Sequence, residues 1–395
     1  MLAIVCPGQG SQAPGLLAPW LELETYRDRM AWFTTVAGID LLEHGTESDA
    51  DTIRDTAIAQ PLIVATGLAA LLELFPRPAA AFSQVSVGAG HSVGEITAAA
   101  GTAVISAEQA LVFVRERGLQ MARASQATPT GMSAILGGDP DEVLATLERH
   151  GLTAANRNGG GQIVAAGTLE QLATLAAEPP AKTRIVPLQV AGAFHTAHMT
   201  PAVERLAGYA RAMTTREAHT RLISNRDGHV VRSGREVLDR LVSQVSAPVR
   251  WDLCMQTMLD LGVTGIIEIP PAGTLIGLAK RAMPGVELLA LRTPNDLDAA
   301  RRMVAEHGDR PDPSADPEWS LVIAPTKGTF GFSSVGIGDR VSGGTVLAHV
   351  RTANDDDVAV TAPHSGWLSQ WLVRDGDEVA PGQPVLRLAP KGAGA

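Results

Sequence analysis

Gly90-His91-Ser92-Val93-Gly94 separates an apolar run at residues 85–89 from a helix-favouring segment at residues 95–100. A serine between two glycines at such a junction predicts a sharp strand-to-helix turn, because glycine lets the chain bend tightly and leaves the hydroxyl exposed at the helix N-terminus. In such a turn the backbone N–H of Val93 would face the oxygen of a tetrahedral intermediate. The same residues also fit an ordinary helix start, in which Ser92 caps the helix and Glu95 completes a capping box.

Short apolar runs alternate with helical patterns on both sides of this turn. This alternation is typical of an α/β layer with a parallel sheet, so we expect an α/β-hydrolase-like core. Two of the predicted helices begin with a capping box, in which a hydroxyl and a carboxamide three residues later satisfy each other's backbone donors. These boxes pair Ser106 with Gln109 and Thr168 with Gln171. The runs predicted as core strands are residues 2–5, 85–89, 223 and 266–269.

Residues 131–188 have a different pattern, which predicts a small subdomain inserted in the larger layer. The expected elements are a strand at 132–135, a helix at 141–149, strands at 152–155 and 162–166, a helix at 169–177 and a strand at 184–188. A β-α-β-β-α-β order is that of a ferredoxin-like unit. We place this subdomain at about residues 128–192.

Composition limits the classes of protein that the chain can be. Its 395 residues are 45% hydrophobic, enough for two or three packed domains, and its formal charge of −10 argues against nucleic-acid binding. Cys6 and Cys254 suggest neither a disulfide framework nor a metal site. The N-terminus has no basic region typical of a signal peptide, and the apolar stretches 61–72 and 96–105 are shorter than the roughly 18 to 20 residues that span a bilayer. We expect a cytoplasmic protein with no membrane partner.

A polar, proline-rich segment at residues 306–319 predicts a linker to a separate C-terminal domain. The domain repeats itself. Ala324-Pro325-x-x-Gly328 recurs at residues 362–366, and Gly338-Asp339-x-Val341-x-x-Gly344 recurs at residues 376–382, in both cases 38 residues later (362 − 324 and 376 − 338). Both copies are rich in strand patterns and Gly-Asp turns, which predicts a flattened β-sandwich of two similar halves.

Three other segments could cooperate with Ser92, because a serine needs a base and oxyanion donors before it attacks an acyl group. The first is the loop Pro7-Gly8-Gln9-Gly10-Ser11-Gln12, which is otherwise an ordinary turn. The second is Ala193-Phe194-His195, whose histidine is otherwise structural. The third is Arg117, which is either a solvated helix charge or a bidentate partner for a substrate carboxylate.

Taken together, these motifs give residues 1–305 a clear family resemblance. The chain resembles the malonyl-CoA:acyl carrier protein transacylases of fatty acid synthesis and the acyltransferase domains of polyketide synthases. The motifs follow the order found in that family: residues 7–12, 90–95, 117–118, 158–162, 193–195, 224–225, 244–251 and 268–281.

The resemblance implies a role for each residue of the candidate site. Ser92 would be the nucleophile and His195 the general base and acid, and an acyl group would move by a ping-pong route from malonyl-CoA to an acyl carrier protein. A phenylalanine before the histidine is the residue that malonyl-specific polyketide acyltransferases tend to have. The remaining implied roles are oxyanion-hole amides for Gln9 and Val93, binding of the malonyl carboxylate for Arg117, orientation of the histidine by the main-chain carbonyl of Gln244, and selectivity for Phe194.

Residues 320–390 resemble biotinyl and lipoyl carrier domains. The resemblance puts Asp355 where those domains have their attachment lysine, and the only lysines here are Lys327 and Lys391. We therefore expect no covalently bound biotin or lipoate. We expect the domain to be a docking or stabilising module, and the sequence does not identify its partner.

Three alternative functions remain open: the first two use the same serine, and the third is non-enzymatic. The chain could be the malonyl-loading subunit of a malonate decarboxylase, a serine hydrolase or thioesterase, or a scaffold that recruits other enzymes. Acyl carrier proteins are usually acidic, so docking on this acidic chain would need a local basic surface. The candidates are Arg115, Lys280 and Arg281.

Overall fold

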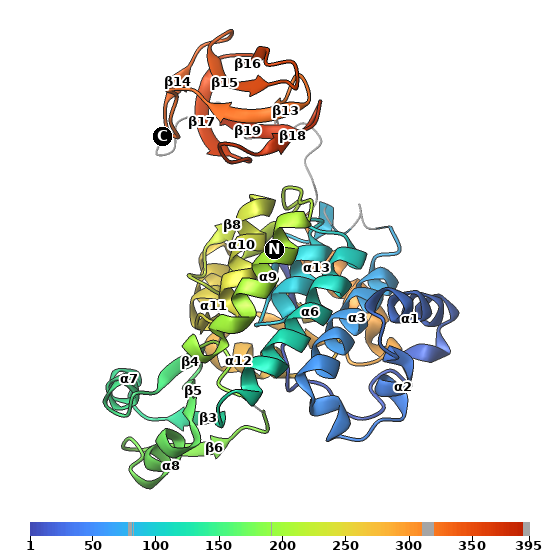
Figure 1. Ribbon diagram of the computed structural model, residues 1–395. Helices are drawn as coiled ribbons and strands as arrows, with labels where there is room; N and C mark the ends of the chain where they lie inside the picture. The colour runs from blue at the N-terminus through green and yellow to red at the C-terminus, as the bar shows by residue number, and fades with distance from the viewer. Residues whose placement is uncertain (78–80, 82, 191, 310–319, 390–395) are drawn as a thin grey trace. The chain divides into compact units, whose positions relative to one another are not determined.

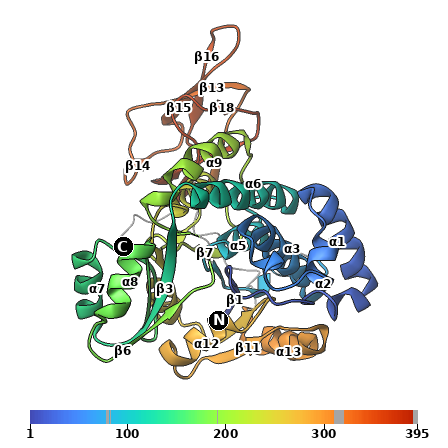
Figure 2. The same cartoon turned by 60° about the horizontal axis from the view of Figure 1, so that its bottom comes forward.

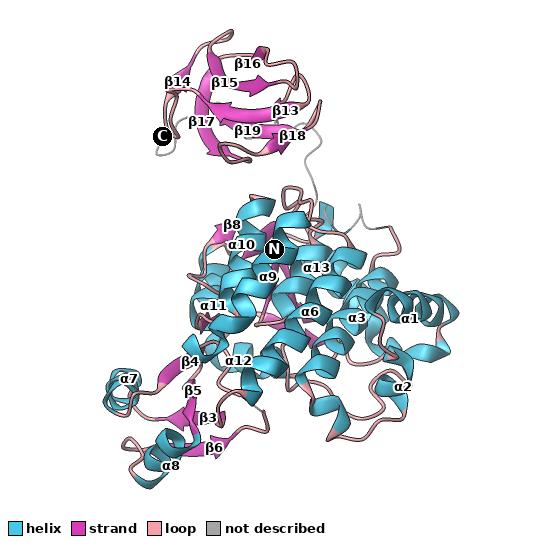
Figure 3. Ribbon diagram, in the orientation of Figure 1, coloured by secondary structure: helices cyan, strands magenta, loops and turns pink. Residues whose placement is uncertain are grey.

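The computed structural model describes residues 1–77, 81, 83–190, 192–309 and 320–389. The chain forms two compact units, Met1–Arg310 and Pro311–Ala395 (Figure 1). Helices are confined to the first unit among the described residues, and the second consists of strands and loops (Figure 3).

The core of the first unit is a six-stranded sheet in the order β11-β10-β1-β2-β7-β8. All neighbouring strands are parallel except β7 and β8, which pair antiparallel. The strands are β1 (Leu2–Cys6), β2 (Val87–Gly90), β7 (Arg221–Ile223), β8 (Val230–Val231), β10 (Gly265–Glu268) and β11 (Glu287–Ala290). Four of these, β1, β2, β7 and β10, overlap the runs predicted as core strands, although β2 begins two residues later and β10 ends one residue earlier than predicted.

Side chains of β1 alternate between the two faces of this sheet, as they must in a strand. Leu2, Ile4 and Cys6 pack into the larger hydrophobic cluster, and Ala3 and Val5 pack into a second cluster on the other face. Helices α11 (Trp251–Asp260) and α12 (Thr274–Ala282) cover that second face. The sheet is thus buried on both sides, which is usual for parallel strands.

Ten helices surround this sheet in the described part of the first unit, apart from those of the insert, and Figure 2 shows several of them end-on or from the side. They are α1 (Glu24–Ala37), α2 (Leu41–Thr46), α3 (Thr56–Leu74), α5 (Gly94–Gly101), α6 (Ala107–Gln126), α9 (Thr200–Ala212), α10 (Gly234–Gln244), α11 (Trp251–Asp260), α12 (Thr274–Ala282) and α13 (Leu297–His307). Short 3-10 turns lie at Trp20–Glu22, Thr52–Arg54, Ala197–Met199 and Pro294–Asp296.

Helix α3 corrects one expectation from the sequence. The stretch 61–72 seemed too short to span a membrane, but the helix begins at Thr56 and its 19 residues are long and apolar enough by composition. In the structure 72% of its most apolar window is buried inside the protein. The helix packs against α1, α5 and α6, so it is the core helix of this unit.

The insert follows α6 and contains the predicted β-α-β-β-α-β order. Its four strands form an antiparallel sheet in the order β6-β3-β5-β4, which is the strand order of a ferredoxin-like unit, and β9 (Val249–Arg250) adds to β4 in parallel. Helices α7 and α8 pack on this sheet through a separate small core. The elements are β3 (Thr130–Gly137), α7 (Pro140–Arg149), β4 (Thr153–Gly159), β5 (Gln162–Thr168), α8 (Leu169–Ala177) and β6 (Thr183–Pro187).

The second unit consists of two four-stranded antiparallel sheets, ordered β12-β19-β17-β14 and β16-β15-β13-β18. Apolar side chains between them form one core. The pairing repeats with the 38-residue period: Thr329 pairs with Arg351, and Trp367 pairs with Ala389. The strands are β12 (Ser320–Ile323), β13 (Gly328–Phe332), β14 (Arg340–Val341), β15 (Val346–Arg351), β16 (Asp357–Thr361), β17 (Gly366–Trp371), β18 (Glu378–Val379) and β19 (Pro384–Ala389).

The structure shows the predicted fold class, a parallel-sheet α/β core followed by an all-β unit. One boundary differs, because α13 continues to His307 and so includes two residues that the sequence suggested as linker. Met303 and Val304 extend the apolar face of that helix and pack in the core. Lys391 and most of the predicted linker lie outside the described residues.

Candidate active site

Ser92 lies in the turn between β2 and α5, with φ at 52°, in the left-handed region. The glycines beside it are required by close packing. A Cβ on Gly90 would lie 2.0 Å from the carbonyl carbon of Gly94, and a Cβ on Gly94 would lie 2.2 Å from the carbonyl oxygen of Cys6. The Ser92 side chain caps no helix, because the N-cap of α5 is Val93 and makes no side-chain cap bond. The cap interpretation is therefore wrong, and the turn is an elbow that presents the serine.

Ser92, His195 and Gln244 form a hydrogen-bonded chain. Ser92 Oγ lies 2.8 Å from His195 Nε2, and His195 Nδ1 lies 2.8 Å from the main-chain oxygen of Gln244. Because a carbonyl oxygen only accepts, Nδ1 carries the proton and Nε2 is left to accept one from the serine. This is the geometry that a serine nucleophile and its base require.

His195 is buried and held by its own backbone as well. Its N–H donates to the main-chain oxygen of Val245 at 3.1 Å, and its φ is 61°. Burial, and next the positive charge of Arg117, lower the pKa of His195 to about 3. The imidazole is therefore neutral near pH 7 and able to take a proton.

Arg117 lies beside the nucleophile and is only 1% exposed. Its Nη2 lies 3.4 Å from Ser92 Oγ, and its guanidinium donates to the side-chain oxygens of Gln60 and Gln244, each at 2.8 Å. Both acceptors are neutral, and none of the carboxylates in the described residues lies within ion-pair distance of Arg117. Burial lowers the pKa of Arg117 to about 10, so the side chain remains cationic at pH 7.

The backbone amides of Gln9 and Val93 are among those near Ser92 that have no acceptor within the described residues. Val93 directly follows the nucleophile. Gln9 lies in the loop after β1, and its side chain is tied to the start of α3, with Nε2 donating to Thr56 Oγ1 at 3.3 Å and Oε1 accepting from Gln60 Nε2 at 3.4 Å. Free backbone donors at an elbow are what an oxyanion hole requires.

The side chain of Gln244 connects most of the site. Its oxygen accepts from Arg117, and its amide nitrogen donates to the main-chain oxygen of Ser92 at 3.0 Å, to Asn225 Oδ1 at 3.3 Å and to Glu95 Oε2. Asn225 Oδ1 also accepts from the N–H of Ser92 at 2.8 Å. These contacts tie the elbow to Gln244 and Asn225.

A cavity of about 420 Å³ adjoins this arrangement. Its lining is rich in carboxamides, and Asn156 Oδ1 is buried there with no partner among the described residues. His91, next to the nucleophile, lines it and lies 2.8 Å from Asn158 Oδ1 through Nε2. Among the lining residues, His91 directly precedes Ser92 in the sequence, Asn158 contacts His91, and Gln162 Oε1 accepts from Asn158 Nδ2. Gln9 also lines the cavity.

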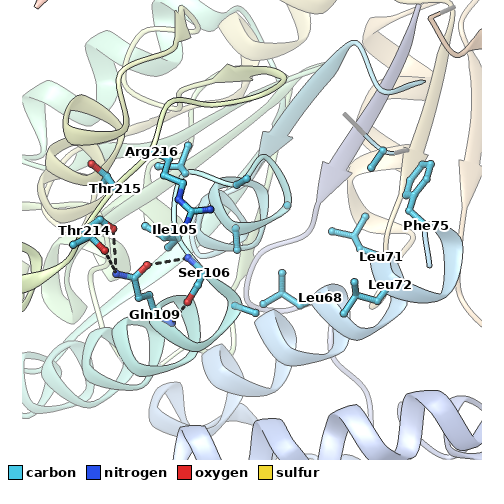
Figure 4. A pocket seen from close by; sticks show the side chains of 16 residues that line it. Leu68, Leu71, Leu72, Phe75, Ile105, Ser106, Gln109, Thr214, Thr215 and Arg216 are labelled. Atoms are coloured by element: carbon cyan, nitrogen blue, oxygen red, sulfur yellow. Dashed lines mark hydrogen bonds between the residues drawn. The ribbon is translucent and has the colours of Figure 1, made fainter. Parts of the chain in front are cut away.

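A second cavity, of about 630 Å³, lies at the other end of α5 (Figure 4). Leu68, Leu71 and Phe75 form its apolar wall, and Gln109 and Arg216 lie at its polar end. None of the described residues that line it belongs to the Ser92 hydrogen-bond network. A cluster of Glu287, Glu306 and His307 has its ligand atoms within 4.8 Å of one another, but it lies on β11 and α13 rather than at the elbow.

The structure brings together Ser92, His195, Arg117, Gln9, Val93 and Gln244, the residues that the sequence suggested for one site. Phe194 lies directly before the histidine, is 6% exposed and packs in the main core. Sequence reasoning missed the contributions of Gln60 and Glu95, and it gave Asn225 no role. Gln60 lies in an apolar helix where no motif marks it, and Glu95 looked like a helix-capping residue.

Comparison with known proteins agrees with this geometry. The chain matches the acyl transferase domain family over residues 3–291. It is 51% identical over 298 residues to the malonyl CoA-acyl carrier protein transacylase of Mycobacterium tuberculosis, a match that covers 75% of this chain and 98% of that protein. The crystal structure of the transacylase from Mycobacterium tuberculosis matches with a TM-score of 0.74 at 50% identity and covers 76% of this chain and 99% of that one.

A further solved structure contains a type II polyketide synthase acyl carrier protein in complex with its malonyl-transacylase. It matches with a TM-score of 0.71 at 27% identity and covers 76% of this chain and 99% of that one. Residues 320–389 lie beyond the part that the family match covers.

Proposed function

This chain belongs to the acyl transferase domain family, among the malonyl CoA-acyl carrier protein transacylases, and from that premise we propose how its own residues perform the transfer. The enzyme moves malonyl from malonyl-CoA to the phosphopantetheine thiol of an acyl carrier protein, for fatty acid or polyketide synthesis. In our proposal Ser92 carries the malonyl group between the two thiols as an ester.

The first half-reaction begins with attack of Ser92 Oγ on the thioester carbonyl. The serine proton goes to His195 Nε2, 2.8 Å away, and the carbonyl of Gln244 stabilises the imidazolium through Nδ1–H. The N–H groups of Gln9 and Val93 donate to the oxyanion. The C–S bond then breaks, and the coenzyme A sulfur takes the proton from His195 as it leaves.

The second half-reaction runs the same steps with another thiol. The phosphopantetheine thiol gives its proton to His195 and attacks the malonyl ester, and Ser92 Oγ recovers the proton as it leaves. Each half-reaction therefore returns the histidine to its neutral form. The low pKa of His195 favours this return, because it disfavours any lasting imidazolium.

Arg117 is the observation that carries the malonyl assignment. Within the described residues the buried guanidinium has two neutral acceptors, and the Glu95 carboxylate acts on it only across the amide of Gln244. It therefore lacks a counter-charge in direct contact, although burying a cation normally requires one. A free carboxylate on the acyl group supplies that charge, and a bidentate pair with Arg117 would place the adjacent carbonyl at Ser92 Oγ, 3.4 Å from Nη2. Phe194 would fill the space that an α-methyl group needs.

The carboxamide-lined cavity is our candidate for the pantetheine arm of both substrates. Pantetheine is a chain with two amides, and the lining offers amide donors and acceptors beside the elbow, among them Asn156 and Gln162. The acidic protein works in the cytoplasm in this proposal, with malonyl-CoA as substrate and without covalently bound biotin or lipoate. Asp355 lies in the β15–β16 hairpin, at the position that the resemblance assigns to the attachment lysine of biotinyl and lipoyl carrier domains.

Intact mass spectrometry tests the proposal. Brief exposure of the full chain to malonyl-CoA without acceptor should add one malonyl group to the wild type and none to the S92A variant. Adding a phosphopantetheinylated carrier protein should then move the group to the carrier. Loss of the adduct at the same rate in buffer alone would favour a hydrolase, and no adduct on the wild type would contradict the proposal.

A further inference from the structure

Glu95 is a buried carboxylate that belongs to none of the steps above. It is 5% exposed and lies in the first turn of α5, three residues after the nucleophile. Both of its oxygens accept hydrogen bonds from other segments. Oε1 accepts from the N–H of Asn225 at 2.6 Å, and Oε2 accepts from the side-chain nitrogen of Gln244.

These contacts determine which way the amide of Gln244 points. An ionised carboxylate only accepts and a guanidinium only donates, so an amide between Glu95 and Arg117 has one satisfied orientation: nitrogen toward Glu95 and oxygen toward Arg117. The amide that Glu95 orients belongs to the residue whose main-chain carbonyl holds His195. The carboxylate is thereby connected to both partners of Ser92 through one residue, to Arg117 by the Gln244 side chain and to His195 by the Gln244 main chain.

We propose that Glu95 is a positioning residue which, by fixing the side-chain amide of Gln244, holds Arg117 in place for the substrate carboxylate and so sets the preference for malonyl over uncharged acyl groups. The inference rests on the proposed function of Arg117. It predicts an effect on which acyl group is loaded, in addition to any effect on stability.

Glu268 offers a matched control within the same chain. It too is a buried carboxylate, with 0% exposure, but its oxygens accept from the backbone N–H groups of Gly273, Leu275 and Ile276, at 2.8 to 3.0 Å. Those contacts fix the turn after β10. They reach no side chain that contacts Ser92, so loss of this charge should affect folding without affecting the choice of acyl group.

The protonation state of Glu95 provides a second way to test its role. Burial raises the pKa of Glu95 to about 7, against the opposing influence of its hydrogen bonds and of Arg117 and Arg240. Arg117 on α6 and Arg240 on α10 stay cationic, and the Cys254 thiol on α11 stays neutral, because burial raises its pKa. When Glu95 is protonated, its O–H faces another donor, either the N–H of Asn225 or the NH₂ of Gln244, and one of these hydrogen bonds is lost. A glutamine at this position would have the same effect through its own NH₂ group.

The experiment compares acyl-serine formation from malonyl-CoA and from acetyl-CoA, in the full chain, by rapid quench and intact mass. The E95Q variant should lower the malonyl-to-acetyl rate ratio by about tenfold or more, the usual consequence of one unsatisfied buried donor, and E268Q should leave the ratio at the wild-type value. An unchanged ratio in E95Q, or an equal drop in E268Q, would overturn the inference.

The wild type provides the same test if E95Q does not fold. Its malonyl-to-acetyl ratio should fall as pH falls from about 8 to about 6, since Glu95 gains a proton and the malonyl carboxylate remains ionised. Titration of His195 affects both substrates alike and cancels in the ratio. A flat ratio would overturn the role of Glu95, whereas failure of the wild type to load malonyl at all would instead contradict the proposed function.

Discussion

Both members of the Ser92–His195 pair have φ near 60°, where residues other than glycine are uncommon. The surroundings hold each of them there. The N–H of Ser92 donates to Asn225 Oδ1, and the N–H of His195 donates to the oxygen of Val245. Backbone contacts therefore fix the 2.8 Å separation of Oγ and Nε2, so little ordering remains for the moment of reaction.

Replacement of Arg117 separates binding of the carboxylate from the chemistry of the serine. The R117A variant should load malonyl from malonyl-CoA about 100-fold more slowly, because a charge-assisted bidentate pair is lost, and should load acetyl at a rate close to that of the wild type. Single-turnover mass spectrometry with both thioesters measures this. An equal loss with both substrates would show that Arg117 serves the elbow and not the carboxylate.

The raised pKa of Glu95 also predicts how stability depends on pH. With a folded-state pKa of about 7 and an ordinary value of 4.5, the folded protein binds more protons between these two values, so this group makes the protein less stable as pH rises from 4.5 to 7. The E95Q variant has no carboxyl group to ionise at this position, so it lacks this decrease in the free energy of unfolding, which is about 3 kcal/mol at most. Urea unfolding at pH 5 and pH 7 should therefore show the free energy of E95Q improving relative to wild type at the higher pH, and a constant difference would contradict the shift.

The sequence predicted the residues to which we assign the chemistry better than the residues that hold them in place. Ser92, His195 and Arg117 occur in short motifs, because a nucleophile, a base and a carboxylate partner each need a distinct residue type. Gln60 acts through a contact between α3 and α6, and Glu95 and the side chain of Gln244 act through a contact between α5 and α10. Contacts between helices distant in sequence leave no local pattern, and Glu95 accordingly looked like an ordinary first-turn acid.

At the scale of elements, the backbone at the end of β1 lies so close to the backbone of the elbow that no side chain fits between them. This approach follows from Gly94, whose missing side chain lets the carbonyls of Cys6 and Pro7 lie against the turn. The N–H of His91 also donates to the oxygen of Cys6 at 2.9 Å. The loop that presents the Gln9 amide is thus positioned by the turn that presents Ser92.

Substitution of Gly94 should therefore damage the site through the backbone. A Cβ at this position would lie 2.2 Å from one carbonyl oxygen and 2.7 Å from the next, so G94A must push β1 and α5 apart. We expect a loss of about 2 kcal/mol or more in the free energy of unfolding and a large loss of malonyl loading. Gly277 is the control, because outside its own helix no described atom lies within 4 Å of a Cβ built there. G277A should load as the wild type does and be up to about 1 kcal/mol more stable, since alanine favours a helix interior over glycine.

The elements themselves were predictable where their pattern is local. Both capping boxes form as expected, at Ser106 and at Thr168. Strand β6 of the insert has the predicted length of five residues and begins one residue earlier. The other three strands of the insert, β3, β4 and β5, are longer than predicted, and β4 continues to Gly159 although residues 156–158 are polar. Pairing with β5 and β9 stabilises these polar residues in the strand, and the sequence of one segment does not show its partners.

At the scale of the whole molecule, the acid-rich chain presents basic residues near the mouth of the carboxamide-lined cavity. Helix α12 lines that cavity through Leu275 and Leu278 and ends in the exposed pair Lys280 and Arg281. Arg281 Nε also donates to the oxygen of Gly160, in the turn between β4 and β5, at 3.2 Å. Arg115 belongs to α6 instead and lies against Gly38 at the end of α1, so it does not share this location.

A carrier protein that delivers its phosphopantetheine arm into the cavity would meet this pair, and coenzyme A has much less surface to meet it with. Reversing both charges, in K280E/R281E, should lower transfer to an acidic carrier protein about tenfold at low salt and lower loading from malonyl-CoA, whose phosphates are also anionic, by a smaller factor. Added salt should reduce the difference in transfer rate between the variant and the wild type, because salt screens the interaction between exposed charges. The control is R205E/R211E, which makes the same change of charge on α9; an equal loss there would mean that net charge, and not this location, governs docking.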